Sequence, residues 1–456
     1  MLTSVTARLR DQVRGRVVEP DDEDYEQARR VYNAVHDRRP AVVVRAVDAA
    51  DVIATVDAAH ESGLDLAVRG GGHSVAGFGT VDDGIVLDLG AMRGIRVDPI
   101  ARTVSVQAGC TWGDVDHATH AFGLGTPSGI VSTTGVSGLT LGGGIGYLSR
   151  AHGLSCDNLI RADVVTADGR LVRADAKEQP DLYWALRGGG GNFGVVTELE
   201  FTLHPVDQVY GGPMLFELEH AEALLTTFRD WIADAPRAMG GFAAFQIAPP
   251  LPFIPQARHG EPFVILVTSF TGPAAHGAEL LGAFRDIAEP VAEHVGVLSY
   301  PAMNSMFDAL LPPGLRHYWK SSFARELTAD AIAAHLVHGP RVPFAQSAMQ
   351  LYPIDGAVHD MGPGDTAFAH RDAAFAPIIA GTWPDPAGDD AALAWVRDYF
   401  AALAPHSTAG GYVNFMPADD RHRVPDNYGS NHGRLVEVKR QYDPDNLFHL
   451  NQNIAP

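Results

Sequence analysis

Apolar residues along the first 205 positions occur in short clusters, and these clusters alternate between spacings typical of strands and of helices. The run at 41–45 predicts a buried strand, the spacing at 49–62 predicts a helix, and the run at 66–69 predicts a second strand. This order indicates a βαβ unit with a loop after its second strand. Other predicted elements are strands at 85–89, 103–107, 162–166 and 195–201, a helix ending at 182–186, and mainly helix at 1–35.

The pattern changes near residue 205, where prolines and aromatic residues become more frequent and helical spacings alternate with extended runs. Such alternation predicts a second domain that contains a sheet with helices on one face. The elements predicted there are helices at 219–233 and 274–288 and extended runs at 263–269, 348–354 and 378–383. After about residue 410 the signals are short again, with an apolar segment at 412–415 and a helical spacing at 434–442.

Composition and charge restrict the class of protein. The chain has 456 residues, of which 46% are hydrophobic and 20% charged, as in a globular protein with a large core. Its net charge of −21 argues against nucleic acid and anionic membrane as partners, because both favour a basic surface. No apolar run approaches the roughly 18 residues of a transmembrane helix, and the N-terminus lacks the apolar core of a signal peptide, so we expect a cytoplasmic protein.

Glycine is the unusual component. Glycine accounts for 48 of the 456 residues, a larger fraction than the usual ~7%. The glycines cluster at 70–72, 123–146 and 188–194. The long cluster is interleaved with apolar residues, so it is not a flexible linker. Glycine-rich apolar backbone is typical of close packing against a flat or bulky group. Backbone N–H groups in such loops also bind phosphate oxygens.

Several familiar motifs do not fit. The segment 189–194 spells G-x-G-x-x-G, but a predicted helix precedes it and a strand follows, which is the reverse of the dinucleotide-binding order. No lysine stands where a phosphate-binding P-loop requires one. His117-x-x-His120 lacks an accompanying carboxylate motif, and the two cysteines cannot build a zinc site, so we expect no metal. Ser137 lacks the final glycine of a hydrolase nucleophile motif.

A series of longer motifs is more specific. The first is Arg69-Gly-Gly-Gly-His73-Ser-Val-Ala-Gly77, and others lie at 135–146, 152–158, 164–169, 184–196 and 442–448. In this order they resemble the motifs of the berberine-bridge-enzyme-like FAD-linked oxidoreductases, which belong to the vanillyl-alcohol-oxidase superfamily. The resemblance is strong at 40–205 and 410–456 and covers the middle of the chain only in outline.

The resemblance implies an α+β fold. Residues 1–205 would form a two-part FAD-binding domain of the PCMH type. Residues 206–410 would form a substrate-binding domain with an antiparallel sheet flanked by helices, and residues 411–456 would return to the FAD-binding domain. The cofactor residues that it implies, besides His73, are Arg69, Gly70, Gly71, Gly72, Ser74, Gly77, Pro127, Gly129, Thr134, Gly135, Gly138, Leu141, Gly142, Gly143, Gly144, Gly146, Asp157, Asn158, Gly194, Val195, Val196, Asn451 and Asn453.

In this family the histidine that matches His73 is bonded to the 8α-methyl group of FAD, and a neutral imidazole is a competent nucleophile. Many members add a second bond through a cysteine, but Val131 occupies that position here, and Cys156 lies in a different motif. We therefore predict a single covalent link. This arrangement resembles the 6-hydroxy-D-nicotine oxidase type more than the bicovalent sugar oxidases. From the residue type alone, a lone histidine such as His73 is more often a surface or satisfied residue, although the adjoining glycine loop favours a function. The alternative for Asn451 and Asn453 is that they only cap a C-terminal turn.

A flavin oxidoreductase that acts on an alcohol also needs a base for the O–H proton. Tyr412 and Asn414 stand where family members place catalytic residues, although Tyr412 would equally suit a core. Gln350 and Tyr352 alternate along a predicted strand, so they share a face and are candidate pocket residues. Tyr318 and Lys320 are weaker candidates by the same argument.

The resemblance implies an oxidase or dehydrogenase that acts on an alcohol or amine carbon of a small organic molecule, with O2 as a candidate electron acceptor. Two other functions stay open. In the first, the protein binds, sequesters or reduces a toxic small molecule. In the second, it catalyses an oxidative ring closure. Substrate identity and oligomeric state are not encoded in any motif that we find.

Overall fold

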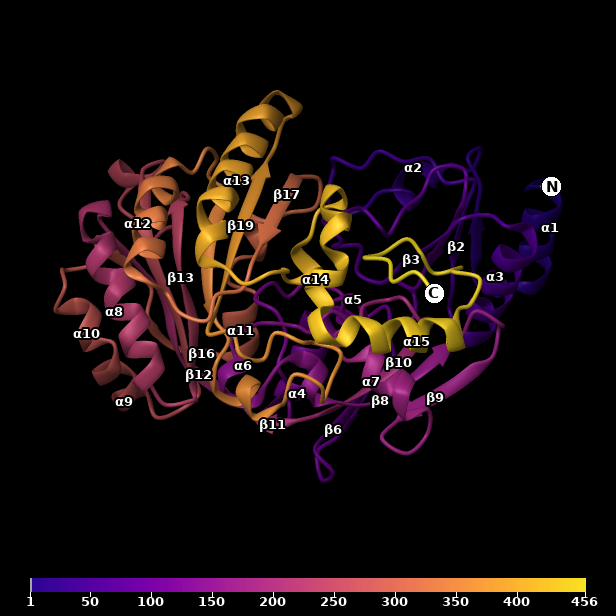
Figure 1. Cartoon of the computed structure of the whole chain (residues 1–456), viewed down its shortest axis with the longest axis horizontal. Coiled ribbons are helices and arrows are strands. Elements are labelled where there is room, and N and C mark those ends of the chain that lie inside the picture. The colour runs from indigo at the N-terminus through magenta and orange to yellow at the C-terminus, as the bar shows by residue number, and fades with distance from the viewer. Residues whose placement is uncertain (1) are drawn as a thin grey trace.

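The computed structural model describes residues 2–456 and has two halves side by side (Figure 1). One half holds a four-stranded sheet in the order β1-β2-β4-β3. In it, β2, β4 and β3 run parallel, and α3 connects β2 to β3, so the predicted βαβ unit is confirmed. Bounds are β1 Arg16–Val18, β2 Val42–Arg45, α3 Ala49–Ser62, β3 Leu66–Arg69 and β4 Ile85–Asp88.

The ends of α3 follow from its sequence. The side chain of Asp48 accepts hydrogen bonds from the backbone N–H groups of Ala50 and Asp51, which satisfies donors that a helix N-terminus leaves free. Gly63, at φ 66°, adopts the left-handed conformation that ends the helix. The helix therefore has the bounds that its spacing predicted.

The second large sheet of this half is antiparallel and has five strands in the order β5-β6-β10-β8-β9. The strands expected at 103–107, 162–166 and 195–201 are confirmed as β6, β8 and β10. Bounds are β5 Ile95–Asp98, β6 Thr103–Gln107, α4 Trp112–His120, β7 Leu124–Gly125, α5 Val136–Leu141, α6 Ser149–His152, β8 Leu159–Val165, β9 Leu171–Asp175, α7 Pro180–Leu186, β10 Val195–Thr202 and β11 His204–Pro205.

The expectation of helix throughout residues 1–35 is only partly right. Helices cover α1 (Leu2–Gln12) and α2 (Tyr25–Ala28), whereas β1 joins the first sheet. After α2 the chain runs between the two halves, where the side-chain N–H groups of Asn33 donate to the carbonyls of Val75 and His317. Contacts that are distant in sequence therefore hold this segment, and a local pattern does not reveal them.

The other half is built on an eight-stranded antiparallel sheet in the order β15-β12-β14-β13-β18-β19-β17, with β16 also paired to β12. The extended runs predicted at 263–269, 348–354 and 378–383 are confirmed as β14, β18 and β19. Bounds are β12 Gln208–Phe216, β13 Met239–Ile247, β14 Pro262–Phe270, β15 Ala292–Glu293, β16 Gly296–Ser299, β17 Arg316–Ser321, β18 Ala348–Pro353 and β19 Phe375–Trp383.

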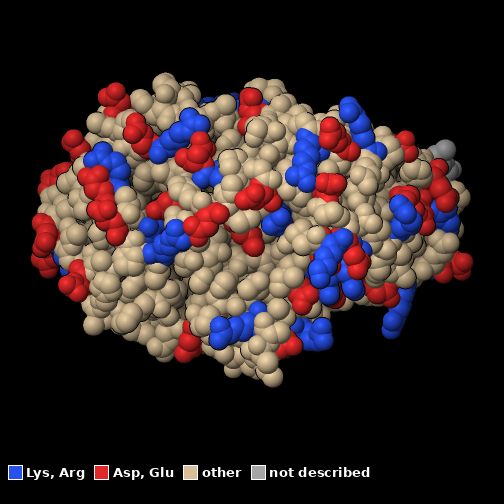
Figure 2. All heavy atoms as spheres, turned by 60° about the horizontal axis from the view of Figure 1, so that its bottom comes forward, with Lys and Arg blue, Asp and Glu red and all other residues tan. Residues whose placement is uncertain are grey.

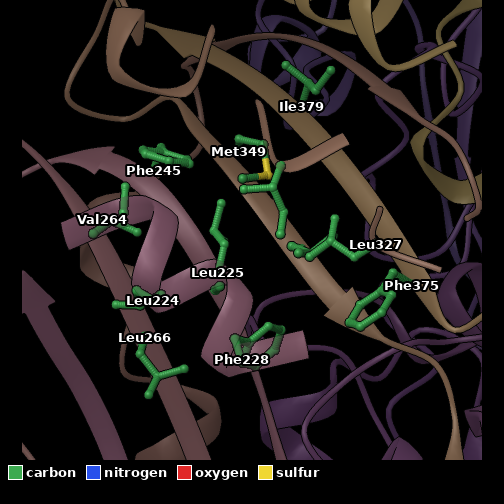
Figure 3. Packing of buried hydrophobic residues seen from close by; sticks show 14 of the residues in the cluster. Leu224, Leu225, Phe228, Phe245, Val264, Leu266, Leu327, Met349, Phe375 and Ile379 are labelled. Carbon is green, nitrogen blue, oxygen red and sulfur yellow. The ribbon is translucent and has the colours of Figure 1, made fainter. Parts of the chain in front are cut away.

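Helices cover one face of this sheet, and its other face is turned toward the first half (Figure 1). Figure 3 shows Leu224, Leu225 and Phe228 of α8 beside Phe245 and Val264 of the sheet. The helix predicted at 274–288 is divided at Leu281, and α12 and α13 were not predicted. Bounds are α8 Ala221–Asp234, α9 Ala274–Leu280, α10 Gly282–Arg285, α11 Tyr300–Asn304, α12 Ala329–His338 and α13 Asp389–Leu403.

The C-terminal segment packs back on the first half through α14 (Val424–Tyr428) and α15 (His432–Tyr442). Lys439 of α15 is fully buried, pairs with Asp443 at 2.6 Å and donates to the carbonyl of Asn192 at 2.8 Å. The apolar segment at 412–415 is a short 3-10 helix (Val413–Phe415) rather than an extended strand. The architecture is α+β, as expected.

Two buried ion pairs join the halves in opposite directions. Arg150 of the first half binds Asp355 of the second, with Nε to Oδ1 at 2.6 Å. Arg371 of the second half makes a two-point contact with Asp157 of the first, at 2.7 and 2.6 Å. Because both guanidinium groups are buried, loss of either partner would leave an uncompensated charge. No helix of the described chain is long and apolar enough to cross a membrane.

Candidate active site

A cavity of about 380 Å³ lies where the two halves meet. Its walls on one side are the loop after β3 and the glycine-rich loops, and on the other side the free face of the eight-stranded sheet. Of the predicted residues, those that line it are Arg69, Gly70, Gly71, Gly72, His73, Ser74, Gly129, Thr134, Gly135, Gly138, Leu141, Gly194, Val195, Val196, Asn451, Gln350, Tyr352, Tyr412 and Asn414.

His73 stands in the cavity wall between two fixed neighbours. Its Nε2 lies 3.1 Å from the hydroxyl of Thr133, and its ring stacks on that of Tyr32 with centroids 3.9 Å apart. Tyr32 also stacks on His317, so one tyrosine lies between two imidazoles. Desolvation lowers the pKa of His73 to about 4, so its imidazole is neutral near pH 7. Thr133 supplies the hydrogen bonds to this ring, from its hydroxyl group and from its backbone.

The glycines allow the cavity walls to approach each other. A Cβ on Gly71 would lie 2.4 Å from the backbone nitrogen of Gly135, so the loop after β3 touches the loop before α5. Gly138 and Gly191 also line the cavity, but a Cβ on either would meet no protein atom within 4 Å. These two positions therefore leave open space at the wall, as a cradle for a bulky group requires.

Unpaired polar atoms occur where the C-terminal segment reaches the cavity. The amide nitrogen of Asn451 donates to the carbonyl of Gly191 at 3.1 Å, whereas its Oδ1 has no partner among residues 2–456. Oε1 of Gln452, at the cavity, and Oδ1 of Asn453, outside its lining, are also buried without a partner in that range. Buried acceptors normally have donors. The oxygens of Asn451 and Gln452, which line the cavity, fit a ligand that carries N–H groups, as the flavin ring and adenine of FAD do.

Tyr412 and Asn414 are coupled at the cavity. The phenol oxygen of Tyr412 accepts from the backbone N–H of Gly144 and from Nδ2 of Asn414, both at 2.8 Å. Burial raises the pKa of Tyr412 to about 12, although these donors oppose the rise by favouring the phenolate. No described residue accepts the proton of its hydroxyl group. Since Tyr412 lines the cavity, its phenol is a candidate to exchange a proton with a group bound there.

Comparison with known proteins gives the site a family. Residues 40–175 match the family model for an FAD binding domain, and residues 411–455 match the berberine and berberine-like model. An FAD-linked oxidoreductase of Dictyostelium discoideum is 32% identical over 460 residues, covering 100% of this chain and 97% of that protein. The chain belongs to the berberine-bridge-enzyme-like FAD-linked oxidoreductases.

Two other relatives agree. The (R)-6-hydroxynicotine oxidase of Paenarthrobacter nicotinovorans is 31% identical, with 97% of each chain covered. The crystal structure of 6-hydroxy-D-nicotine oxidase from Arthrobacter nicotinovorans superposes with a TM-score of 0.86 at 28% identity, covering 97% of this chain and 98% of that chain. This berberine-bridge-enzyme-like protein is thus an FAD-dependent oxidoreductase of the vanillyl-alcohol-oxidase superfamily.

Some predicted cofactor residues of this berberine-bridge-enzyme-like oxidoreductase lie outside the cavity lining and support it from behind. Asp157 binds Arg371, and Oδ1 of Asn158 lies 2.6 Å from Nε2 of His204, so their polar groups have protein partners. Gly144 presents its N–H to Tyr412. The residues in this second group are Gly77, Pro127, Gly142, Gly143, Gly144, Gly146, Asp157, Asn158 and Asn453.

Of the four candidate pocket residues on the sheet, two lie on the face that lines the cavity and two lie on the opposite face. The hydroxyl of Tyr352 donates to Oε1 of Gln350 at 3.0 Å, which confirms that they share a face, and both line the cavity. Tyr318 and Lys320 were wrong as pocket residues. They point to α13 and its surroundings, where Tyr318 binds Asp419 and Lys320 binds Asp420 at 2.6 Å.

Trp319, between Tyr318 and Lys320, lines the cavity instead. It packs edge-on against Phe415 with centroids 5.3 Å apart. Sequence analysis missed Trp319, and it also missed Tyr32 and His317. A strand period can indicate Trp319 once the buried face is known, but no local signal connects Tyr32 to His73.

Val131 lines the cavity, whereas Cys110 and Cys156 are buried free thiols outside it. Burial raises the pKa of both thiols, so neither is a ready nucleophile. In residues 2–456 no cluster of three or more His, Cys, Asp or Glu side chains could hold a metal ion.

Proposed function

We propose that this enzyme is an oxidase that carries FAD on a single covalent bond to His73 and removes hydride from an alcohol or amine carbon of a small molecule. In this proposal, residues 1–205 and 411–456 hold FAD and residues 206–410 hold the substrate. The observation that carries it is the neutral His73 imidazole, held at the cavity wall by Thr133 and Tyr32. The relative named (R)-6-hydroxynicotine oxidase supports an oxidase of an organic nitrogen compound.

The protein orients His73 before any bond forms. Thr133 fixes one ring nitrogen, and the stack on Tyr32 fixes the plane of the ring. Since Val131 replaces the cysteine of bicovalent relatives and neither cysteine lines the cavity, a second link has no nucleophile.

Bound FAD supplies the two-electron acceptor. Tyr412 is the proposed base, because it lines the cavity and the N–H groups of Gly144 and Asn414 stabilise its anionic form. Gln350 and Tyr352, across the cavity on β18, are proposed to hold the substrate oxygen or nitrogen.

The test is acid precipitation of purified protein followed by flavin detection in the pellet. Wild type should keep its yellow chromophore in the denatured pellet, whereas His73→Ala should release FAD into the supernatant. The exposed His117→Ala is the matched control and should behave as wild type. Complete release of flavin from the wild-type protein would refute the covalent link.

Turnover is tested separately, by peroxide release with a panel of alcohols and amines. Steady peroxide production supports an oxidase with O2 as acceptor. Stoichiometric binding without turnover would instead favour sequestration, and a product that has lost two hydrogens and gained a ring would favour oxidative ring closure.

A further inference from the structure

We propose that the substrate is an uncharged, mainly apolar alcohol, or an amine of low basicity that stays unprotonated near pH 7, with an aromatic or aliphatic body and no more than one or two polar groups. Sugars and ionic molecules are excluded by the same argument. This inference rests on the proposed function, because it names the substrate class of the same cavity.

The free face of the eight-stranded sheet is the first observation. Alternate residues of each central strand project into the cavity, and most are apolar, the exceptions being Gln246, Gln350, Tyr352 and Thr382. Strand β13 contributes Phe242 and Ala244, β14 contributes Ile265 and Val267, and β19 contributes Ile378 and Ala380. A body that fills this space replaces water on apolar surface, which is favourable at about 25 cal/mol per Å² buried.

The charge of the whole lining is the second observation. Among the residues around this cavity there is no Asp, Glu or Lys, and Arg69 is the one permanently charged side chain. Arg69 is already neutralised, because it binds Asp88 at 2.8 Å and donates to the carbonyls of Ala28 and Arg30. A charged substrate would lose its hydration here without gaining an opposite charge, and that loss is costly.

The entrance is the third observation. Leu251 and Phe253 lie in the loop after β13, and Phe307, Leu310 and Leu311 lie in the loop before β17. All five side chains are part-exposed and line the cavity. Apolar side chains gathered at the edge of a cavity favour entry of an apolar molecule.

Polar groups on the substrate side are few and mostly engaged. Tyr352 donates to Gln350 at 3.0 Å, and the side-chain nitrogen of Gln246 donates to the carbonyl of Ala345 at 3.3 Å. A sugar would bring many hydroxyl groups, and most would lose water without finding a partner. The geometry can satisfy one or two polar groups near Gln350.

Calorimetric titration of the holoenzyme tests this directly with four probes, three benzyl alcohols of similar size and one disaccharide. They are 4-methylbenzyl alcohol, its anionic analogue 4-(hydroxymethyl)benzoate, its cationic analogue 4-(aminomethyl)benzyl alcohol, and cellobiose. The neutral aromatic alcohol should bind at least about tenfold more tightly than either ion, and cellobiose should show no binding. Equal or tighter binding of an ion or of cellobiose would overturn the proposal, as would the absence of binding by all four probes.

A charge-changing variant tests whether the cavity lining sets this preference for neutral probes. Gln246→Glu adds one carboxylate to the lining with little change of shape, so affinity should move at least about tenfold from the neutral probe toward the cationic probe. Gln441→Glu makes the same change at an exposed position of α15 outside the cavity, and its preference should match wild type. An unchanged preference in Gln246→Glu would place the binding elsewhere. Peroxide release plays no part in these measurements, so a failed oxidase activity would be seen separately.

Discussion

At the scale of single residues, the environment determines what each candidate group can do. His73 is neutral because it is desolvated between Tyr32 and the glycine-rich loop. The phenol of Tyr412 is buried too, but two N–H donors stabilise its anion, and the residue lines the cavity. The two residues are therefore suited to different steps, attachment at His73 and proton transfer at Tyr412.

Tyr412→Phe should lower kcat/KM by about 100-fold or more, because a positioned base contributes 10²–10⁴-fold. The sign of the pH dependence follows from the pKa of about 12. Below that pKa the reactive phenolate grows with pH, so wild-type kcat/KM should rise by up to about tenfold per pH unit from pH 7 to 9. The rise should disappear in Tyr412→Phe. Steady-state kinetics across that range measure both effects.

The matched control is Tyr399→Phe, since Tyr399 is equally buried but bonds His335 in the core of the second half. It should lose some stability and keep the pH profile of the wild type. A rise with pH that persists in Tyr412→Phe would assign the base to another residue.

At the scale of elements, the strand period is visible in the sequence, but the face is not. In β17, Tyr318 and Lys320 face the ion pairs near α13, and Trp319 faces the cavity. The pairing of β17 with β19 sets this orientation, because Trp319 stands opposite Ala380, which also lines the cavity. A shift of one residue would exchange the two faces.

We expect Trp319→Ala to raise KM by about tenfold or more, because it removes aromatic contact area from the cavity wall. Tyr318→Phe is the control on the opposite face. It loses the hydrogen bond to Asp419 and should change KM by less than about twofold. Kinetics with the best substrate of the peroxide panel measure the pair, and equal effects of both variants would contradict the assignment of faces.

At the scale of the whole molecule, buried neutral histidines make the stability of the folded protein depend on pH. Desolvation lowers the pKa of His317, at the joint between the halves, and that of His335, within the second half, to about 3. On the surface, acidic and basic side chains are interspersed on the face shown in Figure 2, without a concentrated basic area. On that face, the charged side chains are spread rather than gathered into a single patch.

These histidines predict a loss of stability in acid. Between an unfolded pKa near 6.5 and the folded value of about 3, the unfolded chain binds protons that the folded chain does not. Each fully buried histidine should therefore lower the free energy of unfolding by up to about 1.4 kcal/mol per pH unit as pH falls through that window. The melting temperature should drop between pH 7 and 4.5.

His335→Gln removes one such group and should make the pH dependence of the melting temperature shallower, whereas the exposed His117→Gln should leave its slope unchanged. Thermal unfolding at several pH values measures all three proteins. A wild-type melting temperature that is constant from pH 7 to 4.5 would contradict this account.

Local signals were enough for much of the FAD-binding half. The βαβ unit could be predicted because the hydrophobic spacing and the terminal Gly63 are short-range features. The glycine motifs identified the cavity wall around His73 because close backbone approach demands glycine itself. The helices α12 and α13 were missed, since their spacing lies in a region rich in other extended and helical signals.

The sequence by itself determined the cofactor family and the position of His73, through motifs whose chemistry is carried by the residues themselves. Only the tertiary structure decided that Tyr32 stacks on His73, that Trp319 faces the cavity and that Asp157 is committed to Arg371. These choices depend on strand register and on contacts between residues far apart in the chain. A local pattern contains the period of a strand, but the neighbours that pack against each face become known only when the chain has folded.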